Sequence, residues 1–128
     1  MLSPSCSKLN MLAVLVIEKD ALTRDTIVQM VEALDNVAIG VDLPEAGLAY
    51  LERVGFDVII VSLRESDPDG ADTALKAKAI YPKVKLVVAS GHALLDELSN
   101  QVDGFLRKPF DLDELDSVMK GVTQSKLH

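Results

Sequence analysis

Five polar side chains stand at or just after the ends of apolar segments, where a folded sheet presents groups for chemistry. Their types are one carboxylate, two amines and two hydroxyls. Amines and a hydroxyl together could hold an anion, and a carboxylate beside a serine could act as its general base. These residues are Glu18, Lys19, Ser62, Ser90 and Lys108.

Whether these side chains meet depends on the elements that carry them. The segment 58–61 is unbroken, apolar and β-branched, which is typical of a strand buried on both faces of a parallel sheet. It leads into a polar, acidic loop in which residues 67–70, Asp-Pro-Asp-Gly, predict a turn. The predicted strands cover residues 12–17, 37–41, 58–61, 85–89 and 104–107.

Five helices are predicted between and after these strands, from apolar positions three and four residues apart and from signals at their ends. Asp20 is expected to cap the first helix and Asp69 the third. Asp111 and Glu114 have the spacing of a capping box at the start of the last helix. The predicted helices cover about residues 21–34, 44–54, 70–81, 93–101 and 112–122.

This alternation predicts one α/β domain, doubly wound, in which helices cover both faces of a five-stranded parallel sheet. Residues 11–124 are expected to form the domain, between a flexible extension, 1–10, and a tail, 125–128. In such sheets ligand sites lie beyond the carboxyl ends of the strands, so the five polar residues are expected to share one site.

Composition narrows the class of protein. A chain of 128 residues, 48% hydrophobic, is sufficient for one core. Its net charge of −7, without a basic cluster, argues against nucleic acid and anionic membranes as partners. No apolar run approaches the roughly 20 residues of a membrane span. The single cysteine, Cys6, excludes an internal disulfide framework and fits a reducing cytoplasm, where we expect the protein.

Taken together, several segments resemble the receiver domain of bacterial response regulators. The match covers about residues 12–122, and the resemblance implies the flavodoxin-like, CheY-like fold with strand order 2-1-3-4-5. The motifs that carry it are VLVIEKD (14–20), DVIIVSL (57–63), DPDG (67–70), VVASGH (87–92) and GFLRKPF (104–110).

A receiver accepts a phosphoryl group on an aspartate at the end of its middle strand, with Mg²⁺ neutralising charge on the phosphoryl oxygens. By this resemblance Glu18 is the first of an acidic pair that helps to hold the metal. Ser90 supplies the hydroxyl, and Lys108 the lysine, that contact the phosphoryl oxygens. Lys19 replaces the second acid, and Ser62 replaces the phospho-accepting aspartate. The chain therefore resembles a pseudo-receiver.

Charge in this pocket is altered by the two replacements. A usual pocket of three carboxylates and one lysine carries about −2, whereas Glu18 with Lys19 and Lys108 carries about +1. We expect Mg²⁺ to bind weakly or not at all, and no other cofactor. Ser62 cannot form an acyl phosphate, and its hydroxyl is a poor nucleophile without a base. Glu18 is expected to pair with Lys19 rather than to serve as that base.

Two alternatives stay open beside this interpretation. The first is a working phosphorelay receiver that uses a displaced acid such as Asp67. A hydrolytic pair of Ser62 and His92 with the same acid is disfavoured, because nothing supplies a nucleophile elbow or an oxyanion hole. The second alternative is a small-anion sensor built from Lys19, Ser90 and Lys108.

The expected role is protein binding in two-component phosphorelay signalling, without catalysis. By resemblance, partners dock on a surface of about residues 93–122, and Phe105 holds the family's aromatic switch position. Phenylalanine has no hydroxyl, so burial of Phe105 as an ordinary core residue is at least as well supported as a role in switching. Because the chain contains no output domain, a histidine kinase, another regulator or a second copy in a homodimer is expected to carry the effect.

Overall fold

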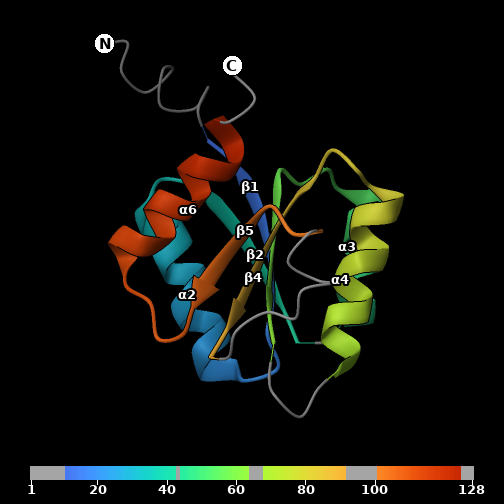
Figure 1. Ribbon diagram of the computed structural model, residues 1–128, viewed down its shortest axis with the longest axis horizontal. Helices are drawn as coiled ribbons and strands as arrows, with labels where there is room; N and C mark the ends of the chain where they lie inside the picture. The colour runs from blue at the N-terminus through green and yellow to red at the C-terminus, as the bar shows by residue number, and fades with distance from the viewer. Residues whose placement is uncertain (1–10, 43, 64–67, 92–100, 125–128) are drawn as a thin grey trace.

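The computed structural model of the chain describes residues 11–42, 44–63, 68–91 and 101–124. Within these ranges it contains five strands and four helices that alternate along the chain (Figure 1). In chain order they are β1 (Ala13–Ile17), α2 (Ala21–Ala33), β2 (Val37–Val41), α3 (Pro44–Arg53), β3 (Val58–Ser62), α4 (Pro68–Ile80), β4 (Lys85–Ser90), β5 (Gly104–Arg107) and α6 (Leu112–Gln124).

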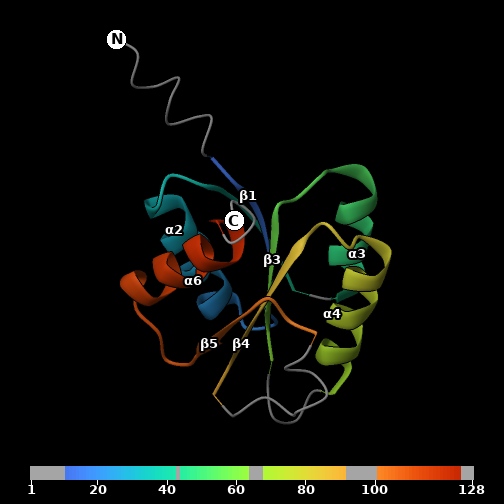
Figure 2. The same ribbon diagram turned by 45° about the horizontal axis from the view of Figure 1, so that its top comes forward.

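The strands form one sheet in the order β2-β1-β3-β4-β5, and every neighbouring pair is parallel. The predicted fold class and strand order are confirmed. The register aligns Ile17 with Val61, and Ser90 with Arg107. The carboxyl ends of the central strands therefore lie side by side at one end of the sheet, as Figure 2 shows.

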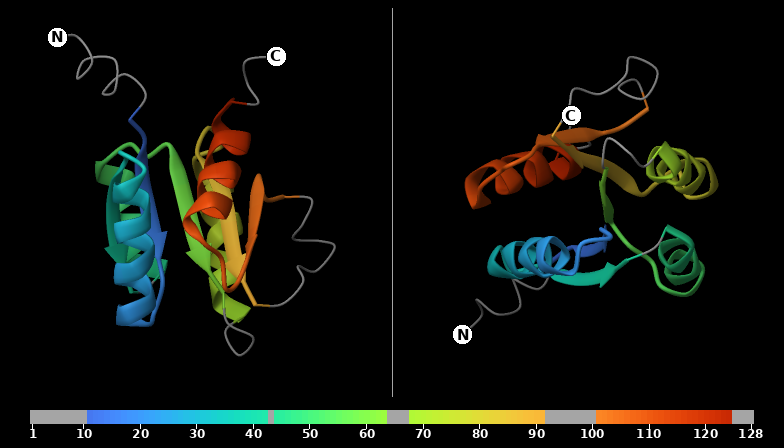
Figure 3. Two further views of the ribbon diagram at one scale, coloured as in Figure 1. Left: turned by 90° about the vertical axis from the view of Figure 1, so that its left-hand side faces the viewer. Right: turned by 90° about the horizontal axis from the view of Figure 1, so that it is seen from below.

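Two layers of helices cover the sheet (Figure 3): α2 and α6 lie on one face, α3 and α4 on the other. Alternate strand residues enter the two cores, because successive side chains of a strand point to opposite faces. Val14, Val58 and Val87 pack under α2 and α6, while Leu15 and Ile59 pack on the other side. Burial on both faces explains why the strand segments are unbroken apolar runs.

Two of the predicted helix starts are confirmed. The Asp20 carboxylate accepts hydrogen bonds from the amide and the hydroxyl of Thr23, at 2.9 and 2.8 Å, and caps α2. The Asp111 carboxylate accepts from the amide of Glu114 at 2.8 Å, and Glu114 accepts in return from the amide of Asp111 at 3.0 Å. This reciprocal pair is the capping box of α6.

The predicted turn at 67–70 and the capping role of Asp69 are wrong over the residues described. Pro68 to Gly70 form the first turn of α4, so Asp69 lies inside the helix. Proline is well suited to a first helical position, since its missing N–H would have no partner there. The predicted helix at 93–101 lies almost wholly outside the described residues, as do the extension 1–10 and the tail 125–128. None of the described helices has the length and apolar character needed to cross a bilayer.

Candidate functional site

The carboxyl ends of the strands bring together residues that the sequence singled out. Glu18 directly follows β1, and Ser62 and Ser90 are the last residues of β3 and β4. Lys108 directly follows β5, and its amide donates to the carbonyl of Ser90 at 2.8 Å. The parallel register therefore assembles the site from four strand ends that are far apart in the sequence.

Glu18 is the centre of the site. Its side chain is only 2% exposed. One carboxylate oxygen, Oε1, accepts from the hydroxyl of Ser62 at 2.5 Å and from the ammonium of Lys108 at 3.2 Å. The other oxygen, Oε2, accepts from the amide of Asp20 at 2.9 Å. A buried carboxylate requires such partners, and here β3, the residue after β5 and the N-cap of α2 supply them.

The electrostatic balance favours the charged form of this carboxylate. Burial by itself raises the pKa of Glu18, but the hydrogen bonds from Ser62 and from the Asp20 amide lower it, as do the charge and hydrogen bond of Lys108. The net effect is a pKa below its ordinary value of 4.5. Glu18 is therefore an anion near neutral pH and a weak base.

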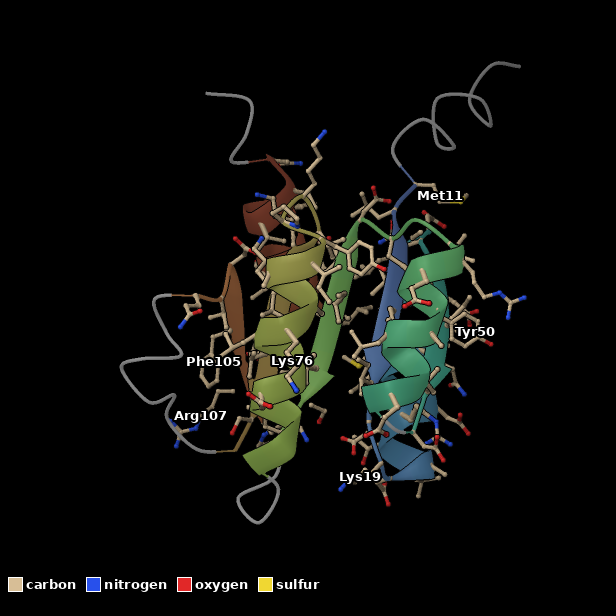
Figure 4. The ribbon with its side chains drawn as sticks, turned by 90° about the vertical axis from the view of Figure 1, so that its right-hand side faces the viewer. Met11, Lys19, Tyr50, Lys76, Phe105 and Arg107 are labelled. Atoms are coloured by element: carbon tan, nitrogen blue, oxygen red, sulfur yellow. The ribbon has the colours of Figure 1, made fainter. Side chains whose placement is uncertain are left out.

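The cation that contacts Glu18 is not the one that we expected to pair with it. Lys108 makes the ion pair, with its side chain 26% exposed. Lys19 is exposed at the carboxyl end of the sheet, at the opposite end of the molecule from Met11 (Figure 4). Side chains of adjacent residues leave a strand end in different directions. Lys108 follows β5, which is separated from β1 by β3 and β4, and its ammonium reaches the Glu18 carboxylate from the same end of the sheet.

Arg24 is a residue of the site that sequence reasoning missed. Its guanidinium donates to the backbone carbonyls of Glu18, at 2.9 Å, and Lys19, at 3.5 Å. The amide of Glu18 in turn donates to the carbonyl of Val41 at 3.0 Å. These bonds hold the backbone on both sides of the buried carboxylate. The sequence feature that could have indicated this role is the position of Arg24, one helical turn after the N-cap Asp20.

The described residues of this site do not fit the Mg²⁺ that receiver domains use. Among the described residues no group of three or more acidic, histidine or cysteine side chains is placed to hold a metal ion. A cation at this edge would have to displace both Lys108 and the Ser62 hydroxyl from Glu18. Loss of these hydrogen bonds inside a buried site is costly, and the Glu18 carboxylate alone offers few of the oxygen ligands that Mg²⁺ prefers.

The geometry also bears on Ser62 as a nucleophile. Its hydroxyl donates to Glu18, so a carboxylate does stand where a general base would be needed. However, the lowered pKa of Glu18 makes that base weak, and its oxygen also accepts from Lys108. The arrangement favours a fixed hydrogen-bond network over proton transfer. His92 and Asp67, weighed as partners of Ser62, lie outside the described residues.

Phe105 lies in β5 with its side chain partly buried against the core formed with α3 and α4. It also lines a surface recess of about 440 Å³ between β5 and the start of α6. The described part of the expected docking surface, 101–122, contains this recess. Its lining also includes Arg107, Asp111 and Glu114.

Comparison with known proteins gives partial sequence similarity. No family model matches the chain. Over 106 residues it is 26% identical to the cell cycle transcriptional regulator CtrA of Caulobacter vibrioides. The match covers 80% of this chain and 46% of CtrA, so the chain spans about half the length of the curated relative that it matches.

Solved structures define the class of fold. A CheY-like response regulator receiver domain from Methylobacillus flagellatus matches with a TM-score of 0.81 at 22% identity, over 88% of this chain and 99% of that one. The response regulator TrrA of Thermotoga maritima, solved with Mg²⁺ and BeF, matches with a TM-score of 0.79 at 18% identity, over 88% and 99%. The fold is that of the CheY-like receiver domains.

Proposed function

We propose that this protein is a pseudo-receiver of two-component signalling: a protein-binding module that is not phosphorylated at the usual site. One observation carries the proposal. Ser62 ends β3, where the resemblance to receivers puts the phospho-accepting aspartate, and its hydroxyl is bound to the buried Glu18. The pocket is therefore closed by its own hydrogen bonds.

The comparisons support the signalling part of this proposal. TrrA, a structural neighbour, was solved with Mg²⁺ and BeF, and CtrA is a transcriptional regulator. The pocket of this chain keeps a glutamate and a lysine at the corresponding strand ends, but joins them to each other in an ion pair. Binding of a partner then takes the place of phosphorylation as the signalling event.

The surface proposed for that partner includes β5 and α6. Its recess of about 440 Å³ has a charged rim with the apolar Phe105 and Val118 among its lining residues. Leu112, at the start of α6, is 39% exposed. Apolar groups surrounded by charges are a common composition of protein interfaces. A histidine kinase, another regulator or a second copy of this chain fits this chemistry.

The proposal is tested by incubation with acetyl phosphate and Mg²⁺, followed by intact-mass measurement. We expect no adduct on the natural protein. Ser62→Asp restores the acceptor but leaves Lys19, so we expect it to react poorly. Adding Lys19→Asp restores the acidic pair and should give an alkali-labile adduct. The double variant is thus the positive control that keeps a negative result on the natural protein informative.

An alkali-labile adduct on the natural protein would instead support the displaced-acid alternative. Asp67→Asn would then lose the adduct if that residue carries it. The anion-sensor alternative is weakened because Glu18 already occupies the ammonium of Lys108 at 3.2 Å. A rise in melting temperature with inorganic phosphate that disappears in Lys108→Ala would revive it.

A further inference from the structure

A second recess lies at the amino-terminal end of the sheet strands, opposite the receiver pocket at their carboxyl ends. Its volume is about 350 Å³. It lies near the start of β1, and Met11 marks this end of the molecule in Figure 4. Six residues from the strand starts, the turn after α4 and the end of α6 line it: Leu12, Phe56, Asp57, Lys83, Lys85 and Thr123.

The two lysines of this recess have no salt-bridge partner among the described residues. Neither ammonium takes part in an ion pair or hydrogen bond there. The recess contains one carboxylate, that of Asp57, which accepts a hydrogen bond from the amide of Ala13 at 2.8 Å. Lys85 also lies close enough to Asp103 for its charge to lower the pKa of that carboxyl. With Lys78, three ammonium groups thus stand near two carboxylates at this end of the sheet, an excess of positive charge on a chain of net charge −7.

The positive charge is a local property of one segment. Residues 76–85, KAKAIYPKVK, contain four lysines and no acid, while the other nine basic residues are outnumbered by twenty acidic ones. The expectation that the chain lacks a basic cluster, drawn from its overall composition, is therefore wrong for this segment. The side chain of Lys78 is bound into the fold at this end of the sheet, since it pairs with Asp103 at 2.8 Å and also donates to the carbonyl of Val84 at 2.8 Å.

That ion pair fixes the wall that carries the two unpaired lysines. Asp103 accepts from the amide of Leu86 at 2.7 Å as well as from Lys78, so α4, β4 and the start of β5 are joined at one carboxylate. The amide of Val84 donates to the carbonyl of Tyr81 at 3.0 Å and closes the turn. A lysine-bearing turn held in this way loses little conformational freedom on binding.

We propose that this recess is a docking site for an acidic segment of a protein partner. Carboxylates of the segment would pair with Lys83 and Lys85, and an adjacent apolar side chain would enter between Leu12 and Phe56. Ile80, which is 61% exposed at the end of α4, offers a second apolar contact beside the same turn. A mixed acidic and apolar segment matches both the charge and the lining.

The observations favour a polypeptide over nucleic acid or an anionic membrane. Nucleic-acid binding commonly uses about 6–10 phosphate contacts, whereas the recess offers two unpaired ammonium groups. The twenty acidic residues of the chain repel an extended polyanion, which cannot keep its charges within one small recess. A short segment with a few carboxylates contacts the lysine-rich turn alone.

The site is independent of the proposed receiver chemistry. The two ends of the central strands are separated by the length of β1, about 17 Å at the usual rise per residue. The result of the phosphodonor experiment therefore has no bearing on the recess, and loss of binding at the recess leaves the phosphodonor result unchanged.

The test uses the full chain and a fluorescein-labelled peptide of Glu-Leu-Asp-Gly repeats, with fluorescence anisotropy as the readout. The control peptide carries Gln and Asn in place of Glu and Asp. We expect saturable binding of the acidic peptide alone, about tenfold weaker in Lys83→Gln/Lys85→Gln, since each exposed ion pair contributes modestly. Arg53→Gln/Lys76→Gln makes the same change in net charge at two exposed residues that do not line the recess, and it should bind as the natural chain does.

Three outcomes would overturn the proposal. One is no binding of the acidic peptide, and another is equal weakening in both double variants, which would indicate a response to net charge only. The third is lysine-dependent binding of a DNA duplex, or of phosphatidylserine vesicles, as tight as that of the peptide. Circular dichroism of each variant checks that the fold is kept, and substitutions of exposed or partly exposed basic residues are not expected to disturb it.

Discussion

Replacement of Lys108 by methionine is the perturbation whose effect follows most directly from the structure. Lys108→Met keeps the aliphatic stem but removes the ammonium that lies 3.2 Å from Glu18. Glu18 would remain buried and would keep its hydrogen bonds from Ser62 and the Asp20 amide. The variant therefore leaves a buried carboxylate without its cation, which is costly in a low-dielectric site.

The expected loss of stability is about 1–3 kcal/mol near neutral pH. Breaking a fully buried ion pair costs about 3–5 kcal/mol, and the 26% exposure of Lys108 reduces this because water partly solvates the group. Exposed Lys76, whose side chain is 65% accessible, pairs with Asp72 at 3.4 Å and gives the control variant Lys76→Met. We expect that control to lose less than about 0.5 kcal/mol.

The pH dependence has a definite sign. The pKa of Glu18 lies below its ordinary value of 4.5 in the folded protein, so the stability gained from its charged form is present above that value and is lost as pH falls through the folded pKa. Lys108→Met removes a cause of the lowering, which raises the pKa of Glu18. The difference between natural and variant protein should therefore shrink as pH falls.

Urea unfolding measured by circular dichroism near pH 7 and at a series of lower pH values that extends well below the ordinary pKa of 4.5 provides the assay, since unfolding free energy is linear in denaturant. A difference that is as large at the lower pH as at the higher would refute the reasoning, because protonation of Glu18 removes the need for a cation. So would a loss near pH 7 no greater than that of Lys76→Met.

Three further predictions concern the elements that position the site. Gly104→Ala should destabilise the fold by about 1–3 kcal/mol, because a Cβ there would lie 2.9 Å from methyl groups of both Val118 and Val122. Thermal unfolding should show a lower melting temperature for this variant and a higher one for Gly121→Ala. A Cβ at Gly121 meets nothing within 4 Å and improves the helix propensity of α6. Asp103→Asn should cost about 1–3 kcal/mol near neutral pH. Its hydrogen bonds with Lys78 and the Leu86 amide outweigh burial and lower the pKa of Asp103, so this cost should diminish in acid unfolding curves as pH falls through that pKa. Glu114→Ala removes one half of the capping box of α6 and should cost about 1 kcal/mol in urea unfolding, whereas an unchanged midpoint would contradict the cap.

Much of the fold was predictable because local signals and the global architecture agree. The unbroken run 58–61 is apolar since β3 is buried on both faces, and the caps at Asp20 and Asp111 act within a few residues of their own helices. The start of α4 was not predictable in this way. A proline-containing sequence that favours a turn also suits the first turn of a helix, and only tertiary packing decides between them.

Membership of the site was predictable, but its pairings were not. The strand ends identify Glu18, Ser62 and Lys108 as neighbours once the sheet is parallel. Which cation contacts Glu18 depends on the direction in which each side chain leaves its strand end, and proximity in sequence wrongly favoured Lys19. Arg24 was missed because it holds backbone carbonyls, for which sequence motifs carry little signal.

The central claim is that the pocket is closed by Glu18, Ser62 and Lys108 and does not accept Mg²⁺ with a phosphoryl group. Titration of the isotopically labelled chain with Mg²⁺ and beryllofluoride, followed by amide NMR, tests it without requiring a covalent reaction. We predict no saturable shifts at Glu18, Ser62, Ser90 and Lys108, and their appearance in Lys19→Asp/Ser62→Asp. Saturable shifts of those four amides in the natural protein would contradict the account.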